Sequence, residues 1–147
     1  MKIYFDLCAI QRPLDTVDQI RIILESEAVL GMFSFCESGR AELISSEALL
    51  YEAEQSTLPI RREHSFAVLE KSKEMIFITE KDKSRALEFL VFGIKPLDAL
   101  HLALAASGQA DYFCTCDDTI LKKSKQIMDL KVKVLSPVDL VQEIEKW

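Results

Sequence analysis

The stretch Lys95-Pro96-Leu97-Asp98-Ala99-Leu100-His101-Leu102-Ala103 decides the fold, because it joins a helix-start signal to a strongly apolar run. Proline suits the first position of a helix, where its missing N–H costs nothing. The stretch therefore predicts a helix from Pro96 to about Ser107-Gly108, with the carboxylate of Asp98 in its first turn. We expect this helix to pack beside the fourth strand of a sheet.

Outside this helix, short apolar runs alternate with helical patterns. The runs that predict strands are residues 2–5, 41–44, 75–78, 111–115 and 132–135. The other helices are expected at about 14–39, 47–55, 60–72, 79–93, 118–128 and from 137 to the C-terminus. Helix-start residues precede several of them: Ser45 and Ser46, Thr79, Asp117 or Asp118, and Ser136-Pro137. The helix at 14–39 follows a turn at Arg12-Pro13 and is expected to bend or split at Gly31. This alternation predicts an α/β fold, a three-layer α/β/α sandwich with a mostly parallel five-stranded sheet.

The composition fits one globular domain, residues 1–147, in a reducing cytoplasm. The four cysteines lack the spacing of a disulfide framework or a zinc site. Asp6 interrupts the N-terminal apolar run too early for a secretory signal, and the run Ala99–Ala106 is too short to span a bilayer. The net charge of −6 argues against long-range attraction to nucleic acid, but carboxylates that bind a cation reverse the charge locally.

Four acidic residues each lie at the end of an apolar stretch or about one helical turn beyond it: Asp6, Glu52, Asp98 and Asp117. Sites in open α/β sheets form beyond the carboxyl ends of the strands, where we expect these side chains to meet. Mg²⁺ and Mn²⁺ are hard cations that prefer oxygen ligands, and a bound cation assists phosphodiester cleavage. The set therefore predicts a divalent-metal site that cleaves a phosphodiester, with Glu47 as the alternative to Glu52.

Each acid taken alone also has an ordinary structural explanation. Asp6 can cap a turn, and Asp117 or Asp118 can cap the helix that follows the fourth strand. Asp98 in the first turn of a helix gains about 0.3–1 kcal/mol from the helix dipole. The prediction of a metal site therefore rests on the whole set rather than on any one member.

The residues around these acids resemble the motifs of the PIN-domain family, the nuclease fold of VapC-type toxins and related ribonucleases. The family's first motif is a strand ending in Asp, here Ile3-Tyr4-Phe5-Asp6. The second places Ser six residues before Glu, here Ser46 and Glu52. The third is Asp-Ala-x-x-x-Ala, here Asp98-Ala99-Leu100-His101-Leu102-Ala103, and the fourth is strand-Thr-x-Asp, here Thr115-Cys116-Asp117.

The resemblance implies a metal-dependent endoribonuclease that uses Mg²⁺ or Mn²⁺ to cleave RNA. It assigns catalytic roles to Asp6, Glu52, Asp98 and Asp117, of which Asp6, Asp98 and Asp117 would hold the metal. Thr115 would supply a supporting hydroxyl near the substrate. The family's members are often dimeric and often held inactive by an antitoxin protein, so a homodimer and an antitoxin partner are expected.

Two positions depart from the family pattern. Many members carry Asn two residues after the first Asp, where this chain has Cys8, and a further acid where this chain has Thr119. The alternative is therefore a PIN-like module with weak or no activity that binds RNA or a protein partner. Arg12 follows the first motif and could grip a phosphate. His101 lies three residues after Asp98, so it either reaches the crevice or packs between helices.

Overall fold

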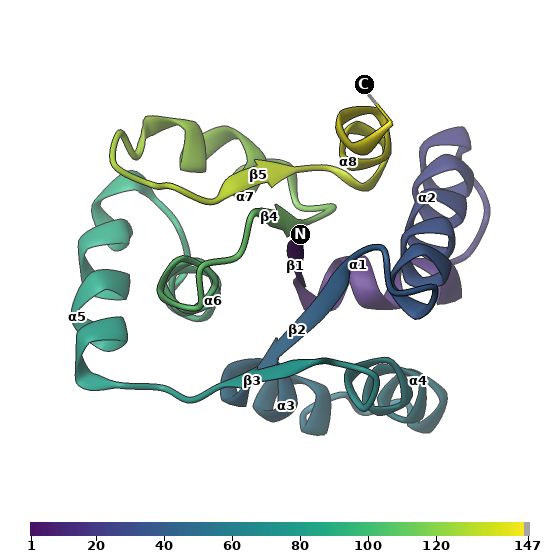
Figure 1. Ribbon diagram of the computed structural model, residues 1–147, viewed down its shortest axis with the longest axis horizontal. Helices are drawn as coiled ribbons and strands as arrows, with labels where there is room; N and C mark the ends of the chain where they lie inside the picture. Colours follow the sequence, from purple (N-terminus) through teal and green to yellow (C-terminus); the bar gives the residue numbers. More distant parts are fainter. Residues whose placement is uncertain (146–147) are drawn as a thin grey trace.

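The computed structural model describes residues 1–145, and its strands form one sheet (Figure 1). The strands are β1 (Lys2–Phe5), β2 (Glu42–Ser46), β3 (Glu74–Ile76), β4 (Tyr112–Cys114) and β5 (Lys133–Leu135). The sheet order is β3-β2-β1-β4-β5, and each neighbouring pair is parallel. The first strand of the chain is therefore the central strand of the sheet. The predicted sheet is confirmed, and it is parallel throughout the described residues.

Helices cover both faces of the sheet. They are α1 (Leu7–Gln11), α2 (Ile20–Glu37), α3 (Glu47–Glu54), α4 (Pro59–Leu69), α5 (Glu80–Phe89), α6 (Pro96–Ser107), α7 (Asp118–Lys123) and α8 (Pro137–Ile144). Short 3₁₀ turns extend three of them: η1 (Arg12–Leu14), η2 (Leu90–Phe92) and η3 (Ser124–Gln126). In Figure 1, α5 and α6 lie on one side of the sheet and α2, α4 and α8 on the other. The three-layer α/β/α sandwich is therefore confirmed.

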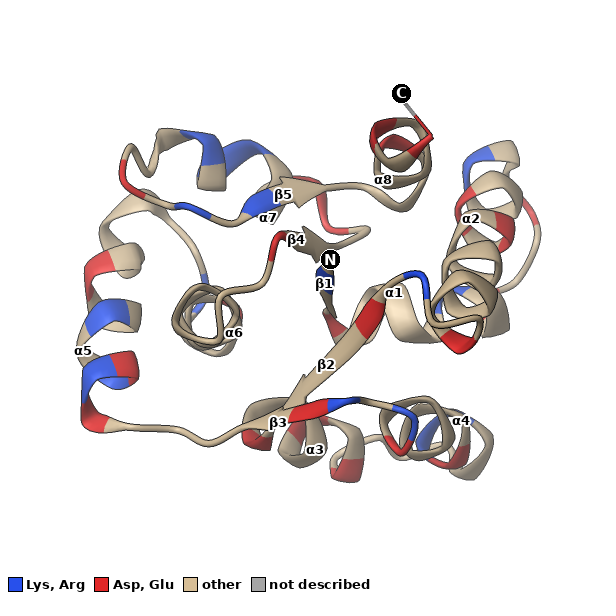
Figure 2. Cartoon of the chain, in the orientation of Figure 1, with Lys and Arg blue, Asp and Glu red and all other residues tan. Residues whose placement is uncertain are grey.

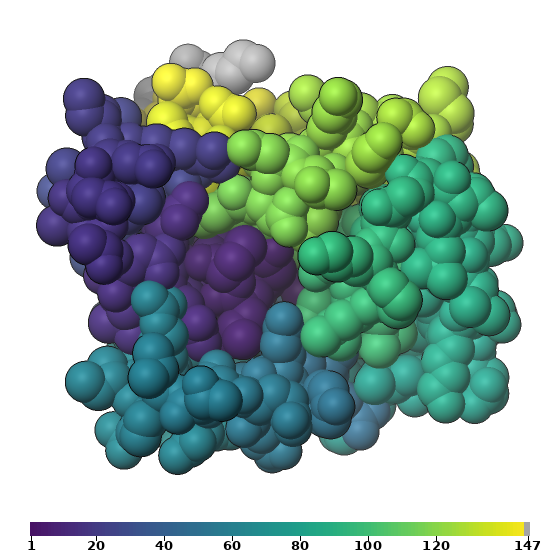
Figure 3. All heavy atoms as spheres, turned by 180° about the vertical axis from the view of Figure 1, so that it is seen from behind, coloured from purple at the N-terminus to yellow at the C-terminus, as the bar shows by residue number. Residues whose placement is uncertain are grey.

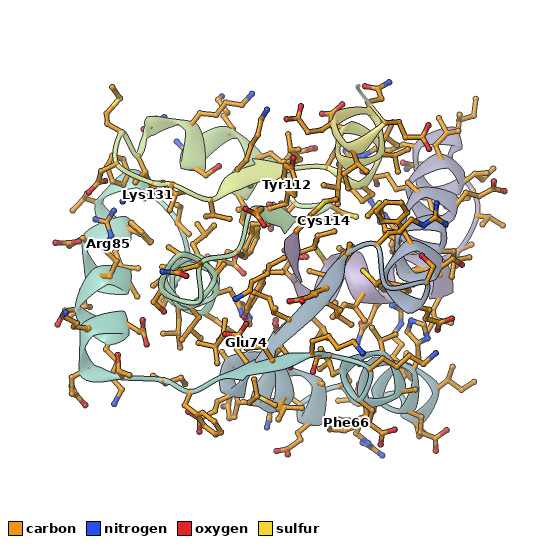
Figure 4. All side chains as sticks on the ribbon, viewed as in Figure 1. Phe66, Glu74, Arg85, Tyr112, Cys114 and Lys131 are labelled. Carbon is orange, nitrogen blue, oxygen red and sulfur yellow. The ribbon has the colours of Figure 1, made fainter. Side chains whose placement is uncertain are left out.

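The helix α6 is apolar on nearly all sides because it is enclosed. It lies between the sheet and α5, with which it makes extensive contacts (Figure 1). In Figure 2, α6 is almost entirely tan, whereas α5 carries many charged residues on the outside of the molecule. Arg85 on α5, labelled in Figure 4, pairs with Glu88 and Asp129. Burying one large aliphatic side chain contributes about 1.5–3 kcal/mol, so α6 is a main contributor to the core.

The predicted helix starts agree with the structure at several positions. The capping side chains are Ser46 for α3, Thr79 for α5, Asp117 for α7 and Ser136 for α8, and each accepts a backbone N–H. Proline occupies the first turn of α6 and of α8. The Thr79 N–H in turn donates to the Asp82 carboxylate, which completes a capping box.

One helix was missed and one local prediction was wrong. Residues 7–11, to which the sequence assigned no element, form the helix α1, because the Asp6 side chain caps them by accepting the Ala9 N–H. The helix α2 runs unbroken from Ile20 to Glu37, although Gly31 was expected to bend or split it. A glycine in a helix interior costs only about 1 kcal/mol, which is too little to break an 18-residue helix. The helix expected to reach the C-terminus ends at Ile144, and residues 146–147 lie outside the described residues.

The core lies on both sides of the central strand. Ile3, Tyr4 and Phe5 are fully buried, and Phe113 on β4 stacks on the Tyr4 ring at a centroid distance of 5.3 Å.

All four cysteines are free thiols. Among residues 1–145, no helix combines the length and the apolar character needed to cross a membrane.

Candidate active site

The candidate site lies at the carboxyl ends of the central strands. Asp6 directly follows β1, and Asp117 follows β4 after two intervening residues. The chain proceeds from β1 to β2 on one side and later returns to β4 on the other, so β1 marks the switch in strand order where ligands bind in such sheets. Figure 3 shows the molecule from behind, with the purple N-terminal segment at the centre, between the teal helices α3 and α4 below and the lighter green of α7 above.

Asp6 is held in a buried position by two neighbours. Its Oδ1 accepts the Ala9 N–H at 3.0 Å and the Cys8 thiol at 3.0 Å, and the residue is 4% exposed. Burial raises the pKa of Asp6 well above its usual value, and the adjacent Cys8 thiol raises it further. The Thr115 hydroxyl and the Ala9 N–H act in the opposite direction. Burial therefore disfavours the charged form of this carboxyl relative to an exposed aspartate.

Asp98 is influenced by acids from two other elements. It lies in the first turn of α6 and is half-buried. Burial raises its pKa, and the charges of Asp117 and Glu52 raise it further, whereas His101 and Lys95 oppose the shift. Asp98 on α6 is therefore influenced electrostatically by two of the other predicted acids, Glu52 on α3 and Asp117 after β4.

Asp117 and Thr115 form a compact turn after β4. Asp117 Oδ1 accepts the Thr119 N–H at 2.8 Å and so caps α7, while the Asp117 N–H donates to Thr115 Oγ1 at 3.0 Å. Thr115 is fully buried, and its hydroxyl also lies 3.5 Å from Cys8 Sγ. This hydroxyl therefore connects the surroundings of Asp6 with those of Asp117 and does not face solvent.

Glu52 and Glu47 both lie on α3, but their side chains have different partners. Glu52 Oε1 lies 2.9 Å from His101 Nε2 on α6. Glu47 instead accepts the Ile78 N–H at 2.6 Å, beyond the end of β3. Of the two candidates, Glu52 is the one placed next to the helix that carries Asp98.

The structure also connects three residues that the sequence reasoning did not join. The Tyr4 hydroxyl lies 2.7 Å from Ser46 Oγ and 2.6 Å from His101 Nδ1. His101 then contacts Glu52, so a chain of hydrogen bonds leads from the sheet to a predicted site acid. The i, i+3 spacing of Asp98 and His101 was the available signal, but the partners of His101 depend on how α6 packs on β1.

Arg12 is engaged by acidic side chains. Its guanidinium donates to Glu25 at 2.7 Å and to Asp15 at 2.9 Å, and Glu25 is buried. Arg61 also pairs with Asp15, at 2.8 Å. The bonds to Glu25 and Asp15 use three of the five N–H donors of Arg12, and its charge is already balanced by two carboxylates.

The donor chemistry of the four acids fits a hard divalent cation, because they offer only carboxylate oxygens. The mutual repulsion felt by Asp98 is the kind that a cation relieves. Within residues 1–145, however, no group of three or more His, Cys, Asp or Glu side chains is close enough together to hold a metal ion. Protein donors occupy one oxygen each of Asp6, Glu52 and Asp117, so a cation would compete with them.

Comparison with known proteins gives matches at the level of structure. No protein-family model and no curated protein matches the chain by sequence. FitAcB from Neisseria gonorrhoeae is 15% identical with a TM-score of 0.57, covering 92% of this chain and 97% of that chain. VapBC2 from Rickettsia felis, solved with a DNA fragment from its promoter, is 12% identical with a TM-score of 0.62, covering 92% and 98%.

A third solved structure is similar over nearly as much of the chain. VapC20 from Mycobacterium tuberculosis, a toxin that cleaves the sarcin-ricin loop, is 13% identical with a TM-score of 0.56, covering 89% of this chain and 98% of that chain. Identities this low establish a shared fold alone. The strand order, the covering helices and these likenesses agree with the resemblance found in the sequence motifs: the chain has the PIN-domain fold.

Proposed function

We propose that this chain is a metal-dependent endoribonuclease of the PIN type, with Asp6, Glu52, Asp98 and Asp117 as its catalytic acids. The observation that carries the proposal is the raised pKa of Asp98, to which burial contributes most and to which Asp117 and Glu52 both add. Acids that disfavour one another's charged forms are characteristic of cation sites and of acid–base catalysis. The RNA-cleaving activity of VapC20, a protein of the same fold, supports RNA as the substrate.

In this proposal, Asp6, Asp98 and Asp117 hold Mg²⁺ or Mn²⁺. Such an ion, when bound, acidifies a water and offsets charge on the phosphoryl oxygens. Glu52 contributes a carboxylate beside them, its Oε1 held by His101. Thr115 keeps Asp117 in place by accepting its N–H, and Arg12 offers its remaining N–H donors to a phosphate.

We further propose that the whole chain, residues 1–147, is one PIN-like domain that acts in the cytoplasm with an antitoxin partner and as a homodimer. FitAcB and VapBC2, which share the fold, support the toxin–antitoxin role. Exposed apolar residues along α2 support a protein contact: Ile20, Ile23, Leu24 and Leu30. The four free thiols suit a reducing compartment.

The second candidate is a PIN-like module with weak or no activity that binds RNA or a protein. Two observations favour it. Asp6 is buried and its pKa is raised, which disfavours the charged form that binds a metal. Cys8 stands where many PIN-domain members have an asparagine. Its thiol donates to Asp6 Oδ1, the same oxygen that caps α1.

The substitution Asp98→Asn separates the two candidates, and the chain supplies a matched control. Asp98 and Asp139 each lie in the first turn of a helix that begins with proline, α6 and α8. Both substitutions remove a similar helix-dipole contribution of about 0.3–1 kcal/mol. With single-stranded RNA and Mn²⁺, we expect Asp98→Asn to lower cleavage by at least about 100-fold, and Asp139→Asn to leave it within a factor of two.

EDTA should abolish the cleavage, and added Mn²⁺ should restore it. Cleavage that persists in EDTA, or in Asp98→Asn, would refute the proposed metal nuclease. Absence of cleavage together with RNA or protein binding would support the second candidate.

A further inference from the structure

His101 is a buried histidine that contacts both the central strand and a proposed catalytic acid. Its side chain is 1% exposed on α6, beside Tyr4 of β1 and Ser46 at the end of β2, both fully buried. Buried polar groups in proteins are almost always hydrogen-bonded, so each donor and acceptor here needs a partner. The contacts of these side chains form one chain that ends on Glu52.

The direction of this hydrogen-bond chain follows from its two ends. The Leu49 N–H donates to Ser46 Oγ at 3.1 Å, and an ionised Glu52 can only accept, so His101 Nε2 donates to it across 2.9 Å. A neutral imidazole has one N–H, hence Nδ1 accepts from the Tyr4 hydroxyl at 2.6 Å. The Tyr4 oxygen in turn accepts from the Ser46 hydroxyl at 2.7 Å.

The opposite direction leaves a buried donor without its partner. If Nδ1 carried a proton, it would donate to Tyr4, and the Tyr4 hydroxyl would then donate to Ser46. Ser46 Oγ already accepts the Leu49 N–H, so the Ser46 hydroxyl hydrogen would lose the Tyr4 oxygen as its acceptor. An unmade bond at a fully buried group is costly, and the first direction avoids it.

We propose that Ser46, Tyr4 and His101 fix the Glu52 carboxylate in one orientation, which makes His101 a positioning residue of the nuclease site. This inference rests on the proposed function, which gives Glu52 a catalytic task. Glu52 is a flexible side chain that is 29% exposed, so without His101 its carboxylate would sample several rotamers. Displacement of a catalytic group by about 1 Å can lower a rate by about 100-fold.

Kinetics with a matched histidine control test the positioning role. His64 Nε2 donates to the Ile10 carbonyl at 2.8 Å, a bond similar in length to that of His101 but without contact to a proposed catalytic acid. We expect His101→Leu to lower kcat for RNA about 10- to 100-fold with KM nearly unchanged, and His64→Gln to change neither. His101→Gln should recover most of kcat, because its amide both accepts from Tyr4 and donates to Glu52. Tyr4→Phe, which removes one hydroxyl, should give a smaller fall in kcat and serves if His101→Leu does not fold.

Nitrogen-15 NMR of the imidazoles tests the same inference without any activity. The chain has two histidines, so His64→Gln assigns both sets of signals. We expect a protonated Nε2 and an unprotonated Nδ1 on His101, and Glu52→Ala should shift the His101 signals and leave those of His64 in place.

An Nδ1–H tautomer in the unmodified protein, or an unchanged kcat in His101→Leu, would overturn the inference. Equal losses in His101→Leu and His64→Gln would also overturn it, because they would indicate general destabilisation. If the unmodified protein cleaves no RNA with Mn²⁺, the proposed function fails, while the NMR signals still decide whether His101 holds Glu52.

Discussion

Asp6 combines two requirements that oppose each other at the residue scale. Its Oδ1 caps α1, which favours a charged carboxylate, yet the residue is almost completely buried, which favours a neutral one. Burial dominates and raises the pKa of Asp6 well above its usual value. The residue proposed as a metal ligand therefore stabilises the fold best when it is not charged.

The pH dependence of stability should reveal this conflict. A carboxyl whose pKa is raised on folding stabilises the folded state most when it is protonated. This contribution is fully present below the pKa of the unfolded chain, near 3.8, and is lost as the pH rises through the pKa of the folded protein. Asparagine cannot ionise and keeps an oxygen for the Ala9 N–H. We therefore expect the free energy of unfolding of Asp6→Asn, relative to that of the unmodified protein, to be higher at pH 8 than at pH 4. Urea unfolding in the presence of EDTA measures this difference.

The control for this measurement has the opposite sign. Arg21 lowers the pKa of Asp118 through a hydrogen-bonded ion pair, so that pair contributes above the unfolded pKa and is lost as the pH falls. Asp118→Asn should therefore lose relative stability at pH 8. A pH-independent difference for Asp6→Asn would contradict the assignment of a buried, titrating carboxyl.

The positions of the candidate site residues could be predicted from the sequence because they follow strand ends and helix starts. Asp6, Asp98 and Asp117 are identified by such local patterns. The contacts of Cys8 with Asp6 and of His101 with Glu52 could not be predicted. They depend on side-chain rotamers and on the packing of α6 against β1, which leave no periodic signal in the sequence.

At the scale of elements, two glycines, one inside a helix and one at the end of another, differ in the space around them. Gly31 lies inside α2, and a Cβ built there meets no atom within 4 Å. Gly108 ends α6, and a Cβ built there would lie 2.3 Å from Ile76 Cδ1 and 2.9 Å from Cγ1. The end of α6 therefore packs closely on β3 because Gly108 has no side chain.

Alanine at each glycine should change stability in opposite directions. Gly31→Ala should stabilise the protein by about 0.5–1 kcal/mol, because alanine favours the helix and fits the space. Gly108→Ala should destabilise it by about 1–3 kcal/mol through overpacking against Ile76. Denaturant midpoints at equal m-values measure both effects, and a destabilised Gly31→Ala would contradict the unbroken helix.

Helices with caps or long periodic patterns could be predicted from the sequence, while the shortest α-helix, α1, could not. Thr79, Pro96 and Ser136 mark helix starts by local chemistry that tertiary contacts did not override. The helix α1 has five residues, too few to show a period of 3.6, and only its cap, Asp6, could have indicated it.

At the scale of the whole molecule, the outer surface of α2 is unusually apolar. Ile20 is 77% exposed and Leu24 lies one turn further along the same helix. Val91, 82% exposed in η2, lies across the sheet from α2 and is a suitable control. If the proposed protein contact uses α2, Ile20→Glu with Leu24→Glu should weaken self-association or partner binding at least tenfold, and Val91→Glu should not. Sedimentation over a range of concentrations measures this, and equal effects of both changes would exclude α2 as the contact.

The central place of β1 has a consequence for how the protein is made. Asp6 and Glu52 are translated early, whereas Asp98 and Asp117 come later, and β4 adds to the open edge of β1 only after Tyr112 to Cys114 have left the ribosome. A chain released before that point has an unpaired edge on its innermost strand and lacks Asp117. Termination before Asp117 therefore yields products that lack the full acidic set and are prone to aggregate, and the complete set exists only once Asp117 has been translated.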